Sequence, residues 1–339
     1  MPTKNDLEYF QALPLDMKVA LTKARLREWV SYFGLDNVII SFSGGKDSTT
    51  LLHIAREMYP DIKAVFADTG LEYPEIREFV KTFDNVEIVR PKITFRQVIT
   101  DYGYPIISKE VSKAIYESKI GRKTGGYRAA IEHMEGIGRF APKDGQRSRY
   151  DFSKYKPLLD VDFNISHKCC DIIKKKPMKR KEKPIVATLA EESMLRTESW
   201  LRFGCNAFES KHQVSKPISF WREQDVLRYI KDNDLQIASV YGDIIEKDGQ
   251  LSFFDDCQLC TTGCKRTGCV YCAFGAHLGR GESRFQMLKR THPRLYNYCI
   301  GGGAYNENGI WIPDKNGLGM GHVFDVCNKI YGEDFLPYK

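Results

Sequence analysis

The chain has 339 residues, 42% of them hydrophobic, which is enough for one large domain with an appendage or for two domains. Its net charge of +7 is a mild basic bias that permits nucleic acid as a partner without requiring it. No apolar run approaches the roughly 18 residues of a membrane helix, and the polar residues 1–6 do not resemble a signal peptide. We therefore expect a cytoplasmic protein with no membrane partner.

The first ninety residues alternate between helical and strand patterns. Apolar residues recur at spacings of three and four over 16–33 and after residue 48, while apolar runs at 38–40, 62–67 and 86–89 predict strands, the first of them buried. Pro74 suits the first turn of a further helix. This order predicts an α/β fold, a doubly wound and mostly parallel sheet with helices on both faces. Ligands of such sheets bind at the carboxyl ends of the strands, where residues 43–45 and 68–70 lie.

Between the first predicted strand and the following helix lies the sequence Ser-Phe-Ser-Gly-Gly-Lys-Asp-Ser, residues 41–48. A turn through two glycines into a helix points several backbone N–H groups at one spot, so an oligophosphate fits there. The spacing matches neither the common phosphate loop nor the dinucleotide pattern. A plain strand-to-helix corner is the alternative, but a corner would not need Ser43, Lys46 and Ser48 beside the glycines.

The loop resembles the PP-loop of ATP pyrophosphatases, which cleave ATP between the α and β phosphates and hold the departing pyrophosphate on this turn. The resemblance implies that the bound nucleotide contacts Ser41, Ser43, Gly44, Gly45, Lys46, Asp47 and Ser48. Lys46 and a Mg2+ ion would neutralise the charge that develops on pyrophosphate. Asp47 would either bind the metal or position Lys46, and sequence does not separate these two roles.

The middle of the chain shows helical patterns over 94–155, interrupted by basic loops at 121–126 and 142–147. These loops are candidate lids or substrate contacts, or plain surface connections. A helix start at 168–174, a strand at 184–188 and a helix at 219–230 follow. The basic run at 168–183 is either a phosphate-binding patch or a solvated helix face.

From about residue 250 the composition shifts to cysteine and glycine, with a helical pattern over 284–298. We therefore predict a PP-loop nucleotide-binding α/β domain at 1–250 with a helical insertion around 94–155. A cysteine- and glycine-rich C-terminal segment at 251–339 would complete an iron–sulfur site.

Ten cysteines in a cytoplasmic chain favour metal or redox chemistry over disulfides. A tandem pair is followed about a hundred residues later by a Gly-Cys-x-x-Cys turn, and one use of this pattern is an iron–sulfur cluster bound by Cys169, Cys170, Cys269 and Cys272. Two alternatives remain open: a replacement ligand from among Cys257, Cys260 and Cys264, or a zinc site at Cys257, Cys260, Cys269 and Cys272. The remaining cysteines are expected to be buried structural residues: Cys205, Cys299 and Cys327.

The order of these features resembles that of the phosphoadenylyl-sulfate (PAPS) and adenylyl-sulfate (APS) reductase family. The likeness runs from about residue 35 to residue 275 and rests on the PP-loop, residues 67–70 before Pro74, the tandem cysteines, the helix at Trp221 and residues 268–272. It implies a 4Fe–4S cluster near the nucleotide, held by Cys169, Cys170, Cys269 and Cys272. It also implies that Asp68 and Gly70 lie near the adenosine and that Arg196 belongs to a loop facing the phosphates.

Two departures from this family change the expected substrate. Sulfonucleotide reductases end in a Glu-Cys-Gly-x-His tail, whereas this chain ends at residues 334–339 without one. Those reductases also carry a degenerate loop, whereas Gly44 to Ser48 are intact here. Both differences favour ATP over a sulfonucleotide, as in the relatives that serve DNA phosphorothioation and tRNA thiolation.

We therefore predict a PAPS reductase-like ATP pyrophosphatase that adenylates an acceptor for sulfur transfer, with ATP, Mg2+ and a 4Fe–4S cluster as cofactors. The catalytic residues would be Lys46, Asp47 and Arg196. The expected partners are a nucleotide substrate, a DNA or tRNA acceptor, a cysteine desulfurase as sulfur donor, and a second copy of the chain in a homodimer. Two alternative functions remain: an assimilatory PAPS or APS reductase that forms sulfite, and a non-catalytic nucleotide-sensing or DNA-binding module.

Overall fold

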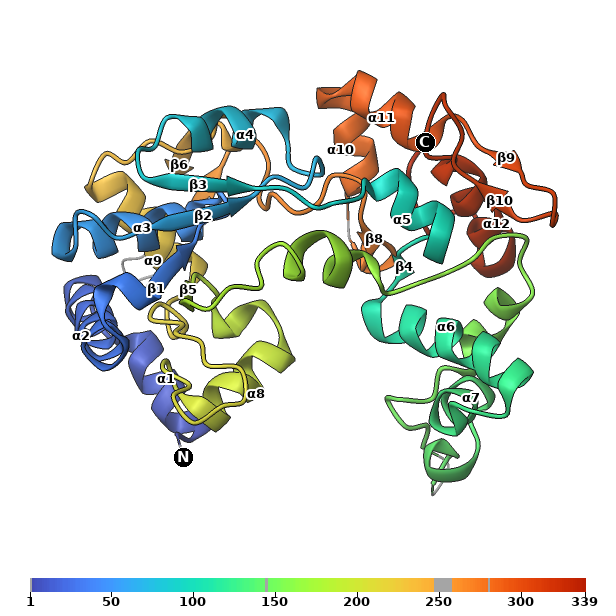
Figure 1. Cartoon of the computed structure of the whole chain (residues 1–339), viewed down its shortest axis with the longest axis horizontal. Coiled ribbons are helices and arrows are strands. Elements are labelled where there is room, and N and C mark those ends of the chain that lie inside the picture. Colours follow the sequence, from blue (N-terminus) through green and yellow to red (C-terminus); the bar gives the residue numbers. More distant parts are fainter. Residues whose placement is uncertain (1, 144–145, 247–257, 280) are drawn as a thin grey trace. The chain divides into compact units, whose positions relative to one another are not determined.

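The computed structural model describes residues 2–143, 146–246, 258–279 and 281–339, which group into two compact units (Figure 1). Unit 1 comprises Met1–Asp68, Glu72–Arg90 and Met178–Thr267, and unit 2 comprises Thr69–Leu71, Pro91–Pro177 and Gly268–Lys339. The predicted insertion at 94–155 thus groups with the C-terminal part of the chain. The domain boundary predicted at residue 250 lies outside the described residues and stays a prediction.

Unit 1 is built on a four-stranded parallel sheet. Its strand order is β3 (Val86–Val89), β2 (Ala64–Ala67), β1 (Val38–Ser41) and β5 (Lys183–Val186). Ile40 of β1 lies opposite Ala64 on one side and Ile185 on the other. Because the apolar residues of β1 are at most 2% exposed, this strand is covered on both faces, as in other buried parallel sheets. The predicted α/β fold is confirmed.

Helices flank this sheet (Figure 1): α1 (Lys4–Ala12), α2 (Leu15–Phe33), α3 (Lys46–Met58), α4 (Pro74–Lys81), α8 (Met194–Phe203) and α9 (Glu223–Asp232). Helix α2 buries Leu26 and Trp29 completely and ends at Gly34, whose φ of +83° favours glycine. A short antiparallel pair, β6 (Ile244–Glu246) and β7 (Leu259–Thr261), also belongs to unit 1.

Unit 2 is mainly helical. Its helices are α5 (Phe95–Tyr102), α6 (Lys109–Thr124), α7 (Arg128–Glu135), α10 (Arg284–Thr291), α11 (Pro293–Ile300) and α12 (Met320–Tyr331). Two small strand pairs join distant segments: β4 (Ile106–Ile107) with β8 (Ala273–Phe274) in parallel, and β9 (Ala304–Tyr305) with β10 (Trp311–Ile312) in antiparallel. No helix in the described parts of the chain combines the length and apolar character needed to cross a membrane.

Two predicted helices differ from the observed ones for local reasons. The helix predicted at 219–230 begins only at Glu223, because the Asp225 carboxylate accepts the backbone N–H of Arg222 at 2.6 Å and caps the helix there. The helix predicted at 284–298 is divided at His292, since Pro293 has no N–H to continue the first helix and instead starts the second.

Candidate functional site

The glycine-rich loop joins β1 to α3 in unit 1. Ser41 ends β1, opposite Val65 and Val186, and Gly45 is the residue that precedes the first turn of α3. Gly44 has a φ of +70°, and a Cβ atom there would lie 2.7 Å from Val80 Cγ2. The first glycine is therefore required both by its backbone conformation and by the close packing of α4 beneath it.

Two serine hydroxyls lie inside this turn. Ser43 Oγ and Ser48 Oγ are 3.0 Å apart, and the backbone N–H of Ser43 donates to Ser48 Oγ at 3.2 Å. Gly45 N–H donates to Ser43 Oγ at 3.4 Å, while Ser48 Oγ donates to the Gly45 carbonyl at 2.9 Å. These bonds hold the loop backbone in shape at the amino end of α3, where the helix dipole favours an anion.

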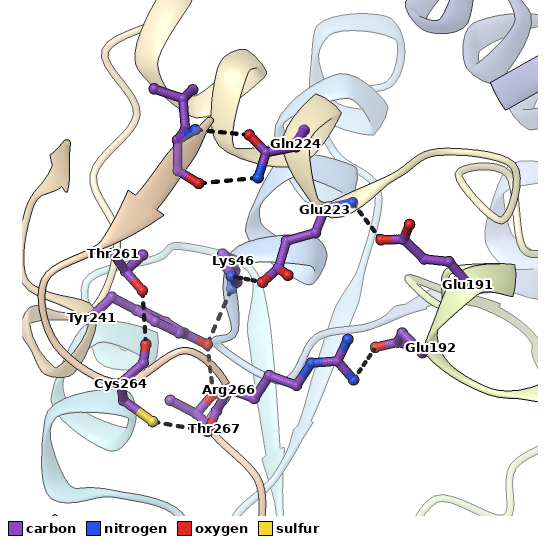
Figure 2. A network of polar contacts seen from close by, with 11 residues as sticks. Lys46, Glu191, Glu192, Glu223, Gln224, Tyr241, Thr261, Cys264, Arg266 and Thr267 are labelled. Atoms are coloured by element: carbon purple, nitrogen blue, oxygen red, sulfur yellow. Dashed lines mark hydrogen bonds and ion pairs between the residues drawn. The ribbon is translucent and has the colours of Figure 1, made fainter. Parts of the chain in front are cut away.

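Lys46 is the cation of the loop and is 4% exposed. Figure 2 shows its ammonium group directed at the carboxylate of Glu223, with which it forms an ion pair. Its backbone N–H donates to the hydroxyl of Tyr241 at 3.4 Å, and that hydroxyl is 2.6 Å from Thr267 Oγ1. Because a buried ammonium is costly without a counter-ion, Glu223 stabilises the position of Lys46.

Carboxylates and guanidinium groups surround this lysine. The Glu191 carboxylate accepts the backbone N–H of Glu223 at 2.6 Å, and Glu192 pairs with Arg196 and lies 3.8 Å from Arg266 Nη1. Burial raises the pKa of Asp47, and the neighbouring carboxylate of Glu223 adds to the rise, whereas Lys46 opposes it. The structure thus brings the predicted residues Lys46, Asp47 and Arg196 into one charged group in unit 1.

Asp68 and Gly70 follow β2. The Asp68 carboxylate, 7% exposed, pairs with Arg77 Nε at 3.0 Å and with Arg90 Nε at 3.0 Å. Burial acts to raise the pKa of Asp68, but the hydrogen bonds from these arginines lower it overall. Gly70 belongs to unit 2 and has a φ of +73°, and an added Cβ atom there would have no atom within 4 Å. The contacts predicted between adenosine and Asp68 or Gly70 are not tested by this geometry and stay predictions.

The four predicted cluster cysteines all belong to unit 2. Cys169 and Cys170 precede a short π-helix (Asp171–Lys175), and Cys269 and Cys272 lie on the turn before β8, where Cys272 N–H donates to the Cys269 carbonyl at 3.1 Å. The thiol of Cys169 interacts electrostatically with those of the other three. Residues a hundred positions apart are therefore neighbours here.

The acidities of these thiols differ with their surroundings. A hydrogen bond from Cys169 lowers the pKa of Cys170 to about 6, and Lys109 and Lys174 add to the effect. The same bond raises the pKa of Cys169. Burial raises the pKa of Cys272 to about 11, with Cys269 contributing. No group of three or more histidine, cysteine, aspartate or glutamate side chains in the described ranges is arranged to hold a metal ion.

The alternative cysteine ligands lie elsewhere. Cys260 is in β7 and Cys264 is buried with its thiol bonded to the Arg266 carbonyl at 2.8 Å, and both belong to unit 1. Cys257, required by the zinc alternative, lies outside the described residues. The expected burial of the three single cysteines is confirmed, with exposures of 9%, 0% and 0% for Cys205, Cys299 and Cys327.

Sequence reasoning missed three residues around the loop lysine: Glu223, Tyr241 and Arg266. Each lies more than 150 positions from Lys46 and carries no motif of its own. The one usable signal was Glu223 itself, an acidic residue at the start of a helix whose amino end follows the buried Trp221. Such a position indicates a helix cap and does not say which loop the side chain faces.

Together, the parallel sheet and the glycine-rich strand-to-helix loop with a buried lysine define an α/β protein of the nucleotide-binding kind. The profile of the phosphoadenosine phosphosulfate reductase domain matches residues 37–274. Since this match covers more than half of the chain, the chain belongs to that family, a class of nucleotide-using enzymes of sulfur metabolism.

Individual relatives were found at two levels of similarity. An uncharacterized protein of Methanocaldococcus jannaschii is 46% identical over 265 residues, which cover 77% of this chain and 46% of that protein, so the chain spans about half the length of this relative. The sulfate adenylyltransferase subunits 2 of Citrifermentans bemidjiense and Pseudoalteromonas translucida are 22% and 23% identical, over 69% and 68% of this chain and 70% of each relative. The crystal structure of PAPS reductase from Candida auris in a phosphate complex is 12% identical, covers 70% of this chain and 91% of its own, and has a TM-score of 0.35.

Proposed function

We propose that this protein is an ATP pyrophosphatase that activates an acceptor for sulfur transfer. The observation that carries the proposal is the intact loop, in which a buried lysine and two serine hydroxyls lie at the amino end of α3. A reductase of sulfonucleotides has no pyrophosphate to hold, whereas an enzyme that splits ATP between the α and β phosphates needs such a cradle.

In the proposed reaction, the β and γ phosphates of ATP lie on residues 43–48. An acceptor oxygen attacks the α phosphorus, the bond to the α–β bridging oxygen breaks, and pyrophosphate leaves with the electron pair. Lys46 neutralises charge on the leaving group, and Arg196 contributes from its place beside Asp47. A Mg2+ ion, when bound, would supply further positive charge to the phosphates. A sulfur nucleophile then attacks the atom that bears the activated oxygen, a base carbon in tRNA or a backbone phosphorus in DNA, and AMP departs with that oxygen.

For the adenosine, we assign Asp68 at the end of β2 in unit 1, while the predicted contact of Gly70 stays a prediction. Asp68 holds the guanidinium groups of Arg77 and Arg90, of which Arg90 is 72% exposed. In this assignment the carboxylate orients two cations beside the nucleotide.

A 4Fe–4S cluster is the proposed metal cofactor, with Cys169, Cys170, Cys269 and Cys272 as ligands. The fit rests on the mutual charge interactions of these four thiols, since a four-iron cluster spreads its ligands farther apart than one ion does. When bound, such a cluster supplies a redox and sulfur-binding centre. Lys109 and Lys174 favour the thiolate of Cys170 and so lower the cost of binding iron there.

As the acceptor, we propose DNA or tRNA, with sulfur delivered by a cysteine desulfurase to a homodimer of the chain. Residues 121–156 carry nine lysines and arginines against four acidic residues. Three of the arginines have highly exposed side chains, at 92%, 63% and 71% for Arg128, Arg139 and Arg147. A basic surface of this kind suits a phosphate backbone.

The proposal is tested by offering two classes of nucleotide under anaerobic conditions. ATP should yield AMP and pyrophosphate, whereas PAPS or APS with a thiol reductant should yield no sulfite. Sulfite without ATP cleavage would support the alternative that the family suggests, a sulfonucleotide reductase. ATP binding without turnover, unaffected by Lys46→Ala in a functional assay, would support a nucleotide-sensing module instead.

A further inference from the structure

Both hydrogen-bonding groups of Lys46 have partners within unit 1. Its backbone N–H donates to the Tyr241 hydroxyl, and its ammonium group pairs with the Glu223 carboxylate (Figure 2). These are the two donors that a residue at the first position of a phosphate-binding helix offers to an anion. Two protein oxygens therefore stand where phosphate oxygens would be bound.

Tyr241 lies directly on the loop backbone. Its side chain is 2% exposed, and a Cβ atom on Gly45 would lie 3.2 Å from its hydroxyl oxygen. Burial raises the pKa of Tyr241 to about 12, so the hydroxyl is neutral at physiological pH. A neutral oxygen accepts less strongly than an anionic one at a helix amino end, so phosphate would compete well for this N–H.

The backbone of Glu223 is fixed by a hydrogen bond, whereas its side chain is partly exposed to solvent. Its backbone N–H donates to Glu191 Oε1 at 2.6 Å, which fixes the start of α9, while its side chain is 37% exposed and can turn toward solvent. The carboxylate of Asp47 lies in the same electrostatic group. A polyphosphate bound to Lys46 would add several negative charges beside these carboxylates, and the repulsion would favour release of Glu223.

We propose that Glu223 and Tyr241 are positioning residues that compete with phosphate for Lys46, so that they set the affinity of the loop for pyrophosphate. The inference rests on the proposed function only in naming pyrophosphate as the ligand. Glu223 keeps the buried ammonium in place, and the nucleotide takes over this role by exchange of partners. The same exchange in reverse helps pyrophosphate to leave.

The test is titration of the full-length protein with inorganic pyrophosphate and magnesium, followed by calorimetry. Lys46→Ala should abolish measurable binding, which places the ligand on the loop. Glu223→Gln should raise the affinity about five- to tenfold, because the competing charge is removed. Tyr241→Phe should raise it about threefold, because phosphate no longer displaces a hydrogen bond.

Matched controls exist on α3 and α9. Glu57→Gln, at the far end of α3, removes a carboxylate that pairs with Lys23, and Tyr229→Phe, in α9, removes a hydroxyl bonded to His53 of α3. Neither should change pyrophosphate affinity. Glu223→Asp, which keeps the charge but withdraws it from Lys46, should give a smaller rise than Glu223→Gln, with circular dichroism confirming that each variant is folded.

Unchanged or weaker binding in folded Glu223→Gln and Glu223→Asp would overturn the competition. Because pyrophosphate binding requires no ATP cleavage, this outcome is separate from failure of the proposed function. A protein that binds pyrophosphate more tightly after Glu223→Gln but leaves ATP intact would contradict the proposed reaction alone.

Discussion

The phosphate loop of unit 1 (residues 43–48) and the cysteine group of unit 2 (Cys169, Cys170, Cys269 and Cys272) differ in the charge of the ligand that each would bind. In the loop, the amino end of α3 and the buried Lys46 supply positive charge. In the cysteine group, the hydrogen bond between Cys169 and Cys170, burial and the neighbouring thiols all raise the pKa of Cys169. In our proposal an anion completes the first arrangement, and iron that replaces thiol protons completes the second. The predictions below separate these two regions, since a change in one should leave the other intact.

The largest expected effect is that of Lys46→Ala on ATP cleavage. Removing one preorganised charge that stabilises a leaving group lowers turnover by about 100-fold or more. The measurement is the rate of AMP and pyrophosphate formation, with Lys63→Ala as control, since Lys63 is an exposed lysine just before β2. Iron content should be the same in both variants. A rate within a few fold of wild type in Lys46→Ala would contradict the assignment.

The next largest effect concerns iron. Cys169→Ser and Cys272→Ser should each lower iron and acid-labile sulfide to a small fraction of the wild-type content after anaerobic purification, because a cluster ligand is lost. Cys260→Ser, in β7 of unit 1, should retain both. Pyrophosphate affinity should stay unchanged in all three variants. Iron loss in Cys260→Ser instead would move the ligand set to the alternative cysteines.

A smaller effect is expected for Gly44→Ala on stability. The added Cβ would lie 2.7 Å from Val80 Cγ2 and 2.9 Å from Ile76 Cγ2, at a φ of +70°. Backbone strain and overpacking together should cost about 2–4 kcal/mol in the free energy of unfolding by urea. Gly125→Ala, at a φ of +75° with nothing within 4 Å, isolates the backbone strain and should cost about 1 kcal/mol. Equal costs would mean that the loop does not pack on α4 as described.

The smallest effect is a pH dependence at Asp68. Its pKa is lowered in the folded protein, so its contribution to stability is present above the ordinary carboxyl pKa of about 4 and is lost as the pH falls through the lower folded value. Asp68→Asn should therefore make the unfolding temperature fall less steeply as the pH is lowered. Thermal unfolding between pH 6 and 3 measures it, and an identical fall in both proteins would show that the two arginine pairs contribute nothing.

The fold and the loop could be predicted because their signals are local. A strand, two glycines and a helix are contiguous at residues 38–58, so the sequence carries the geometry of the turn directly. The order of strands along the chain likewise predicted a parallel sheet, and the structure confirms it. Helix starts were less certain, since Asp225 caps α9 from inside the predicted helix.

The partners of Lys46 could not be predicted because they come from distant segments. Glu223 and Tyr241 reach the loop only through the packing of α9 and of residues 239–241 on unit 1. No periodicity or spacing connects them to residue 46. The cysteine group is an intermediate case, because the family pattern named the four residues. That their thiols lie near one another follows from the pairing of β4 with β8 and the folding of unit 2.

The most direct test of the central claim is the fate of ATP labelled at the α phosphate. The loop account predicts that the label appears in AMP, or in an adenylated acceptor, with one unlabelled pyrophosphate released for each, and that Lys46→Ala stops both. Label recovered in ADP, with free phosphate as the second product, would mean that the bond between the β and γ phosphates is cleaved and would contradict the account.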